Sequence, residues 1–233
     1  MSLGVIGGMG PMATACFLEI LTEKTYAERD GDHLETIIYS CPQIPDRTSF
    51  ILGKSDSDPR PKIIETALKL QREGVSAIAV PCVTARSFKE EIQASVDVPI
   101  LFGVEAAARK LSESGIRKAG IMATDGSIKT RVIQDVLESF GIEAVIPSDD
   151  DRAKVMSLIY DDVKTGRDPD LDKLREVRDN LTAAGAQTVI LGCTELSIIN
   201  RDFGLTRTNS NIIDSMEVLA MASILKCGKK IKL

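Results

Sequence analysis

The fold of this chain can be read outward from Gly185-Ala-Gln-Thr-Val-Ile-Leu-Gly-Cys193-Thr-Glu195. An earlier stretch repeats the same plan, Gly74-Val-Ser-Ala-Ile-Ala-Val-Pro-Cys82-Val-Thr84, and in both the cysteine follows the glycine by eight residues (193 − 185 and 82 − 74). A short apolar run that begins at a glycine predicts a buried strand of a parallel sheet. Each cysteine then lies at the carboxyl end of its strand, the edge where open α/β sheets bind ligands. We therefore expect two thiols at ligand-binding edges, one in each half of the chain.

Strands and helices are predicted to alternate along the rest of the chain. We expect further strands at 2–6, 35–40, 98–102, 118–123, 143–146 and 212–214. We expect helices at 12–27, 59–73, 84–94, 105–114, 128–140, 150–166, 171–184 and 215–225. Loops are expected at 41–48 and 200–211, and the basic residues 226–233 are expected to fray. This alternation predicts the α/β class, with parallel, doubly wound sheets.

Three pairs of segments indicate an internal duplication. The two glycine-to-cysteine stretches are offset by 111 residues (193 − 82), residues 99–105 match 211–217 at 112 (217 − 105), and residues 4–7 match 120–123 at 116 (120 − 4). We expect two similar domains, residues 1–98 plus 212–233 and residues 99–211, with the active site in the cleft between them. The alternative is that all α/β proteins share this alternation of strands and helices, but the nearly constant offset favours duplication.

Composition narrows the class of protein. The chain has 233 residues, 43% hydrophobic and 27% charged, and a net charge of −5, which are ordinary values for a globular protein. The acidic balance argues against nucleic acid or anionic membrane as partner, and no apolar run reaches the length of a membrane span. No secretory signal is visible, so we expect a cytoplasmic protein whose five cysteines are free thiols. There is no C-x-x-C motif and a single histidine, so no metal site is expected.

Two thiols that face one cleft suit proton transfer at a carbon. A thiolate can take a proton from one face of the carbon while a thiol returns a proton to the other face, which inverts the configuration. The site must stabilise the resulting carbanion-like transition state with fixed donors and exclude water. Strand ends and helix starts near residues 8–10, Thr84, Thr124 and Thr194 are expected to offer such donors to a carboxylate.

Several motifs together resemble those of the aspartate/glutamate racemase family of cofactor-independent amino-acid racemases. They are Gly7-Gly-Met-Gly-Pro11 with Ala13-Thr14, Pro42-Gln-Ile-Pro-Asp-Arg-Thr48, Pro81-Cys82-x-Thr84-Ala85, Ala123-Thr124 and Leu191-Gly-Cys-Thr-Glu195, so the resemblance runs from residue 4 to about 217. It implies two similar α/β domains, a two-base mechanism with Cys82 and Cys193, an acidic amino acid as substrate, and often a homodimer. It also implies that no pyridoxal phosphate or other cofactor is needed.

The resemblance places the remaining site residues. The substrate-binding residues expected are Met9, Gly10, Arg47, Val83, Thr84, Thr124, Lys164, Thr194 and Glu195. Among these, Arg47 and Lys164 stand where the family has cations that contact the acidic side chain of the substrate. The chain departs from the family at Val83 and Arg86, where the usual motif reads Pro-Cys-Asn-Thr-Ala-His. We expect these two residues to alter substrate specificity.

Other interpretations remain beside this one. A related decarboxylase or isomerase of small dicarboxylates would keep the fold, and a non-catalytic homologue would bind a small acid. Gly8-x-Gly10-x-x-Ala13 imitates a dinucleotide-binding motif, but the second strand runs into Ser40-Cys41-Pro42 and offers no acidic residue for a ribose. We expect Cys16, Cys41 and Cys227 to be buried hydrophobic residues. Glu195 is expected either to orient the Cys193 loop or to begin a helix.

Overall fold

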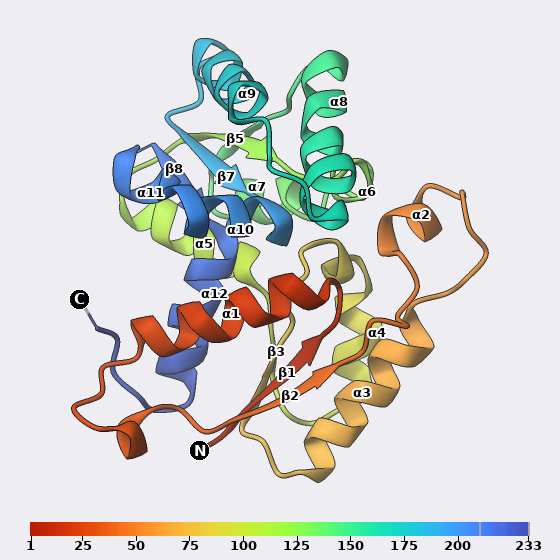
Figure 1. Cartoon of the computed structure of the whole chain (residues 1–233), viewed down its shortest axis with the longest axis vertical. Helices are drawn as coiled ribbons and strands as arrows, with labels where there is room; N and C mark the ends of the chain where they lie inside the picture. The colour runs from red at the N-terminus through yellow and green to blue at the C-terminus, as the bar shows by residue number, and fades with distance from the viewer. Residues whose placement is uncertain (210, 233) are drawn as a thin grey trace. The chain divides into compact units, whose positions relative to one another are not determined.

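Two four-stranded parallel sheets form the framework of the protein (Figure 1). The computed structural model describes residues 1–209 and 211–232. These form two units, Met1–Gly103 with Met216–Leu233, and Val104–Ser215. The α/β class with two parallel sheets is therefore confirmed, whereas the domain boundaries expected at 98/99 and 211/212 stay a prediction.

The sheet of the first unit has the strand order β2-β1-β3-β4. Its strands are β1 (Leu3–Gly7), β2 (Thr36–Ser40), β3 (Ala77–Ala79) and β4 (Ile100–Leu101). The helical segments of this unit are α1 (Pro11–Lys24), η1 (Asp30–Asp32), α2 (Arg47–Ile51), α3 (Arg60–Arg72), η2 (Thr84–Phe88), α4 (Lys89–Ala94) and α12 (Ser215–Lys226). Every residue of the central strands β1 and β3 is buried, which explains why both read as short apolar runs rather than alternating patterns.

The sheet of the second unit repeats this order as β6-β5-β7-β8. Its strands are β5 (Lys118–Met122), β6 (Glu143–Val145), β7 (Thr188–Leu191) and β8 (Ile212–Asp214). The helical segments are α5 (Gly103–Glu113), α6 (Asp125–Lys129), α7 (Gln134–Ser139), α8 (Asp149–Ser157), η3 (Leu158–Asp162), η4 (Val163–Thr165), α9 (Leu171–Ala183), α10 (Thr194–Phe203) and α11 (Leu205–Thr208). Because the strand order is identical in the two units, the topology agrees with an internal duplication.

The helix predicted at 128–140 is wrong, because the structure has two short helices there. Thr124 caps the first, α6, by accepting a hydrogen bond from Ser127 N at 3.2 Å, so this helix begins earlier than expected. Arg131 has a positive φ of 57°, which interrupts the helical backbone before α7. The side chain of Gln134 donates to Ile128 O at 2.9 Å and so satisfies a carbonyl at the break.

The helices predicted at 150–166 and 84–94 are each divided. After α8 the chain forms one π-helical segment, η3, and a short 3₁₀ segment, η4, which ends at Gly166 with φ 75°. The wider π turn buries Leu158 and Ile159 side by side in the core of the unit, each 0% exposed. In the first unit, residues Thr84–Phe88 are 3₁₀ and only Lys89–Ala94 are α-helical.

The loops predicted at 200–211 and 41–48 are partly helical. Helix α10 continues to Phe203, and α11 follows Gly204, whose φ is 63°. Asn200 tolerates a helical position because its amide nitrogen donates to Asp214 Oδ2 at 2.9 Å and its oxygen accepts from Thr206 N at 2.8 Å. In the other segment, Arg47 already begins α2. Ser210 of the predicted loop lies outside the described residues.

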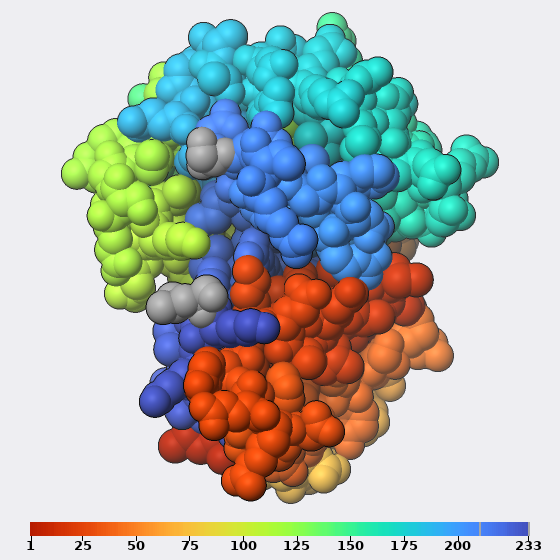
Figure 2. Space-filling model, turned by 60° about the vertical axis from the view of Figure 1, so that its left-hand side comes forward, coloured from red at the N-terminus to blue at the C-terminus, as the bar shows by residue number. Residues whose placement is uncertain are grey.

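The C-terminal segment is ordered against the chain that follows α1, so the predicted fraying is wrong up to Lys232. Thr25 and Ile231 form an antiparallel bridge, and Tyr26 N donates to Lys230 O at 2.8 Å. Figure 2 shows this blue segment lying against the orange segment after α1. The backbone pairing holds the terminus in place although its side chains are basic. Leu233 lies outside the described residues.

Candidate active site

Cys82 lies just beyond the carboxyl end of β3, beside the glycine loop that follows β1. Cys82 is 6% exposed, and its backbone N–H donates a hydrogen bond to Val80 O at 2.8 Å. Gly8 in the neighbouring loop has φ 89°, and a Cβ there would lie 2.3 Å from Cys41 N. Only glycine therefore allows the β1 loop to approach the end of β2 so closely. The loop is also fixed by Gly8 N, which donates to Thr14 Oγ1 at 2.8 Å.

Arg47 joins two of the predicted substrate-binding segments. Its residue is 7% exposed, and its Nη2 donates to Met9 O at 3.1 Å. Its Nη1 donates to Pro45 O at 3.0 Å and to Ile44 O at 3.4 Å. The guanidinium thus holds the Met9–Gly10 loop against the segment that precedes α2. The structure thus brings together two residues that were predicted to bind the substrate, Arg47 and Met9. The sequence did not reveal that the contact is made through the backbone oxygen of Met9.

Val83 and Thr84 follow Cys82 at the start of η2 and are both buried, at 7% and 6% exposure. Arg86 is half-buried one turn later, and its N–H donates to Val83 O at 3.0 Å. The two departures from the family motif therefore flank the thiol on one short 3₁₀ segment.

An aromatic cluster holds this segment against α2. The rings of Phe50 and Phe88 have centroids 6.1 Å apart, and the Arg60 guanidinium lies 5.6 Å and 6.0 Å from them. Asp58 holds that guanidinium through Oδ1 to Nε at 3.0 Å and Oδ2 to Nη2 at 2.8 Å. Sequence reasoning missed Arg60, and the only available signal was that Phe50 and Phe88 each follow a motif of the site.

In the second unit, four predicted site residues form one connected group. Cys193 is the N-cap residue of α10, and its Sγ donates to Glu195 Oε2 at 2.9 Å. Thr194 Oγ1 donates to the same oxygen at 3.1 Å. The Lys164 ammonium lies 4.0 Å from Glu195 Oε1 and 4.0 Å from the centroid of the Tyr160 ring. Sequence reasoning missed Tyr160, although residues 160 and 164 are neighbours on one face of a helix.

The surroundings of Cys193 favour its protonated form. Burial raises the pKa of the Cys193 thiol well above its usual value. The Glu195 carboxylate raises this pKa further, both by charge repulsion with the thiolate and by accepting the S–H hydrogen bond, while Lys164 opposes the shift. Cys193 is therefore a thiol near neutral pH in the protein as it stands.

Thr124 lies at the same edge of the second sheet as Cys193. It follows β5, whose Met122 pairs with Leu191 of β7, and Met122 O accepts from Gly192 N at 2.7 Å. The Thr124 residue is 3% exposed, and its hydroxyl is used by the cap of α6. The structure thus brings Thr124 to the predicted edge, with its hydroxyl bound to Ser127.

Asp214 is a buried carboxylate at the end of β8 that sequence reasoning missed. It is 1% exposed, and it accepts from Ser197 Oγ at 2.6 Å and from Asn200 Nδ2 at 2.9 Å. Both donors lie on α10, so Asp214 fastens the helix that begins at Cys193 to the edge of the sheet. The signal available in the sequence was the pair of polar residues on the helix that follows the second cysteine.

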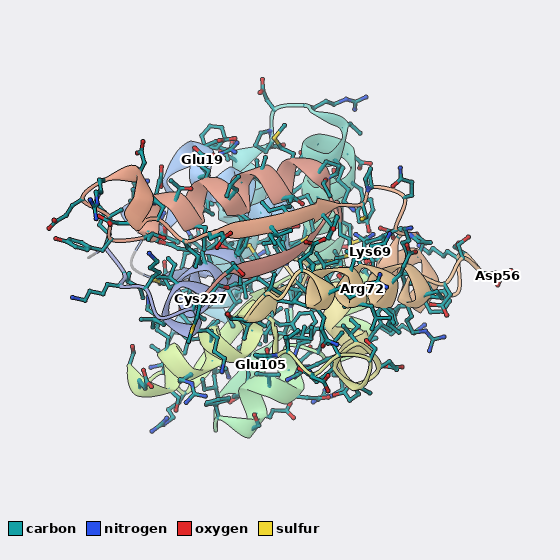
Figure 3. All side chains as sticks on the ribbon, turned by 90° about the horizontal axis from the view of Figure 1, so that it is seen from below. Glu19, Asp56, Lys69, Arg72, Glu105 and Cys227 are labelled. Atoms are coloured by element: carbon teal, nitrogen blue, oxygen red, sulfur yellow. The ribbon has the colours of Figure 1, made fainter. Side chains whose placement is uncertain are left out.

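The other cysteines lie away from this group. Cys16 and Cys227 are buried, at 0% and 4% exposure, and Cys227 (labelled in Figure 3) points its Sγ at Ser2 O, 3.8 Å away. Cys41 is only half-buried, with its Sγ 3.7 Å from Thr66 Oγ1, so the expectation of a fully buried residue is wrong there. None of the five cysteines, all of which lie in the described part of the chain, forms a disulfide.

The described residues offer neither a metal site nor a membrane-spanning helix. Across residues 1–209 and 211–232, no three His, Cys, Asp or Glu side chains gather in a way that fits a metal ion. None of the helices in these ranges combines the length and hydropathy that crossing a membrane requires.

Comparison with known proteins identifies the family of the chain. A model of the Asp/Glu/Hydantoin racemase family matches residues 6–222. The chain belongs to this family. It is accordingly an enzyme of the isomerase class, and the resemblance seen in the motifs is confirmed.

Three known proteins resemble the chain over nearly its whole length. The broad specificity amino-acid racemase RacX of Bacillus subtilis (strain 168) is 31% identical over 228 residues, which are 95% of this chain and 96% of RacX. The structure of aspartate racemase from Picrophilus torridus is 31% identical, with a TM-score of 0.83, and the match covers 100% of this chain and 96% of that one. An aspartate racemase homologue from Pyrococcus horikoshii OT3, 24% identical with a TM-score of 0.77 over 97% of this chain and 99% of that one, shares the fold.

Proposed function

We propose that the chain is a cofactor-independent amino-acid racemase in which Cys82 and Cys193 exchange protons with one substrate carbon. One observation carries the proposal. Two sheets of identical strand order each have a buried cysteine just past the end of the corresponding strand, β3 for Cys82 and β7 for Cys193. A two-base racemase needs a matched pair of groups of this kind, one for each face of the carbon. The shared cleft expected from the sequence belongs to the same proposal.

The proposed reaction is balanced by the two sulfurs alone. One thiolate takes the α-proton, so that the Cα–H bond breaks, an S–H bond forms, and the electron pair stays on Cα. The other thiol then gives its proton to the opposite face of Cα and is left as the thiolate. The N-terminus of α10 at Cys193 provides backbone N–H groups that would bind a substrate carboxylate.

We propose an acidic amino acid as substrate. Relatives named for aspartate and for broad specificity support an amino acid, and the acidic side chain follows from the cations Arg47 and Lys164. The proposed binding residues are unchanged from the sequence: Met9, Gly10, Arg47, Val83, Thr84, Thr124, Lys164, Thr194 and Glu195. Their roles in binding rest on the family motif, and a cytoplasmic homodimer is likewise proposed. A decarboxylase would need one essential cysteine, so the matched pair favours the racemase.

Exchange of the α-proton with solvent tests the proposal directly. The dialysed protein is incubated in deuterated water with single enantiomers of aspartate, glutamate and neutral amino acids, and deuterium at Cα is followed by proton NMR. We expect incorporation together with formation of the opposite enantiomer for at least one acidic amino acid. Absence of exchange with every amino acid would support the non-catalytic alternative.

A further inference from the structure

The two thiols have different chemical surroundings although the two sheets match. The exposures of the two residues are nearly equal, 6% for Cys82 and 7% for Cys193. The sulfur of Cys193 donates to the Glu195 carboxylate at 2.9 Å. In the part of the chain that the structure describes, the sulfur of Cys82 has no carboxylate as a hydrogen-bond partner. The second site therefore carries a charged group that its counterpart lacks.

Glu195 is held in place by three neighbours and is itself 4% exposed. Cys193 and Thr194 donate to Oε2, and the Lys164 ammonium lies 4.0 Å from Oε1. Burying a carboxyl group is costly unless hydrogen-bond donors and a cation compensate the loss of water. Lys164 supplies that cation, and its side chain is still 27% exposed. The side chain of Glu195 is thus held directly against the sulfur of Cys193.

The position of Lys164 depends on the irregular end of the α8–η3–η4 segment. The π turn at Leu158–Asp162 and the 3₁₀ turn at Val163–Thr165 both pack against α10. This path sets the Lys164 ammonium over the ring of Tyr160, 4.0 Å from its centroid, which is favourable for a cation. π turns inserted in helices are often found at functional sites. The irregularity therefore serves to fix the charge next to Glu195.

We propose that Glu195 holds Cys193 in the thiol form as the resting proton donor, with Lys164 as its positioning countercharge, so that the free enzyme awaits a substrate whose α-hydrogen faces Cys82. The effect of Glu195 on the Cys193 thiol stands by itself, and only the part of Cys193 as proton donor to a substrate rests on the proposed function. With such a substrate, Cys82 gains the proton of Cα, and Cys193 gives its own proton to the opposite face of Cα and becomes the thiolate. The reverse enantiomer requires the minor form, in which the proton lies on Cys82.

The direction of the effect follows from charge. Ionising Cys193 would lose the S–H hydrogen bond and set a thiolate against a carboxylate, so Glu195 opposes ionisation. Lys164 attracts the thiolate and opposes this effect. On the neighbouring elements, Asp214 of β8 is bonded to Ser197 and Asn200, and Asp161 of η3 and Arg207 of α11 are exposed. Asp162 of η3 accepts a hydrogen bond from Asp170 N. Among the residues that the structure describes, Glu195 and Lys164 are the charged groups that shift the pKa of the Cys193 thiol.

Alkylation of each cysteine with neutral iodoacetamide, followed by peptide mass mapping between pH 6 and 11, tests the inference without turnover. Only the thiolate reacts, so the pH midpoint of each cysteine reports its ionisation whatever its accessibility. Glu195→Gln keeps an acceptor but removes the charge, and we expect alkylation of Cys193 at pH 8 to rise about tenfold or more, the effect of lowering its pKa by about one unit. Lys164→Met should shift the Cys193 midpoint in the opposite direction.

Two controls separate this result from trivial causes. Glu176→Gln, on the same unit, removes an exposed carboxylate that pairs with Lys154, and it should leave the Cys193 midpoint unchanged. Cys82 in the same samples reports any general change of the fold. An unchanged Cys193 midpoint in both Glu195→Gln and Lys164→Met overturns the inference, as does an equal shift at Cys82. A shift confined to Cys193, with no racemisation of any amino acid, supports the charge pair and rejects the proposed function instead.

Discussion

The Nη2 atom of Arg47 donates a hydrogen bond to the backbone oxygen of Met9 at 3.1 Å, across a separation of 38 residues. This contact gives Arg47 a structural role in addition to its proposed role as a substrate cation. The same guanidinium serves Pro45 O and Ile44 O, so three carbonyls around the glycine loop depend on one side chain. Lys69 and Arg72, labelled in Figure 3, lie on α3 of the same unit, and the Lys69 ammonium pairs with Glu65 at 2.6 Å.

Arg47→Ala is expected to lower stability as well as substrate binding. The carbonyls of Met9 and Pro45 would lose a charged donor, and a buried group left without a partner costs about 1–3 kcal/mol. Urea unfolding measures this change. Arg29→Ala is the control, since the Arg29 side chain is 84% exposed and should change stability by less than about 0.5 kcal/mol. The binding role predicts, in addition, a larger rise in KM for glutamate than for alanine, and equal rises would leave only the structural role.

Gly8→Ala is expected to be more damaging than Gly53→Ala. Both glycines have a positive φ, 89° and 71°, so alanine is strained at either position, at a cost of about 1 kcal/mol. Only at Gly8 would the new Cβ also meet backbone, 2.3 Å from Cys41 N, whereas nothing lies within 4 Å at Gly53. Unfolding free energies of the two variants test this. Equal losses would mean that the loop can move away from Cys41 at no cost.

Cys82→Ser and Cys193→Ser are each expected to reduce racemisation about 100-fold or more, because a serine hydroxyl is a much weaker acid and base in this role. Cys227→Ser is the matched control, since this thiol lies at the end of α12 and is not part of the proposed site. The rates are measured by circular dichroism of the amino acid in both directions. Near-normal turnover of either single variant in both directions contradicts the two-base assignment.

Val83→Asn combined with Arg86→His is expected to raise turnover of aspartate or glutamate above that of the native enzyme. Val83 is 7% exposed beside Cys82 and offers no hydrogen bond, so a substrate group facing it lacks a partner worth roughly 0.5–1.5 kcal/mol. Steady-state kinetics on a panel of amino acids measures the change. If the double variant behaves like the native protein on every substrate, the two departures from the family motif are neutral.

The raised pKa of the Cys193 thiol predicts a loss of stability in alkaline solution. The folded protein keeps the proton to a higher pH than the unfolded chain, whose thiols ionise near about 8.5. The stabilisation is fully present below that pH and is lost as the pH rises toward the folded pKa. Burial also raises the pKa of Cys227, so both thiols contribute. Urea unfolding from pH 7 to 10 should show a smaller decline in Cys193→Ala than in the native protein, and an unchanged decline would contradict the shift.

Local patterns in the sequence were enough to predict the fold class and the place of both cysteines. A glycine followed by a short apolar run predicts a buried strand, because strand and helix periodicity depends on near neighbours. The repeat of that pattern then indicated two equivalent sheets. The strand order β2-β1-β3-β4 and its copy β6-β5-β7-β8 agree with that prediction. The sequence alone therefore determined the framework and the residue types at its ligand-binding edges.

Contacts between residues that are distant in sequence decided the remaining features of the two units. The continuation of α10 through Asn200 depends on Asp214, 14 residues away, which satisfies a side chain that otherwise favours a loop. The π turn that precedes Lys164 contains the buried residues Leu158 and Ile159, whereas periodicity predicts only a regular helix there. Arg47 could be recognised as a cation of the site, but its bond to Met9 O exists only once the two loops meet. Such contacts stabilise conformations that no local preference encodes, and so only the tertiary structure could reveal them.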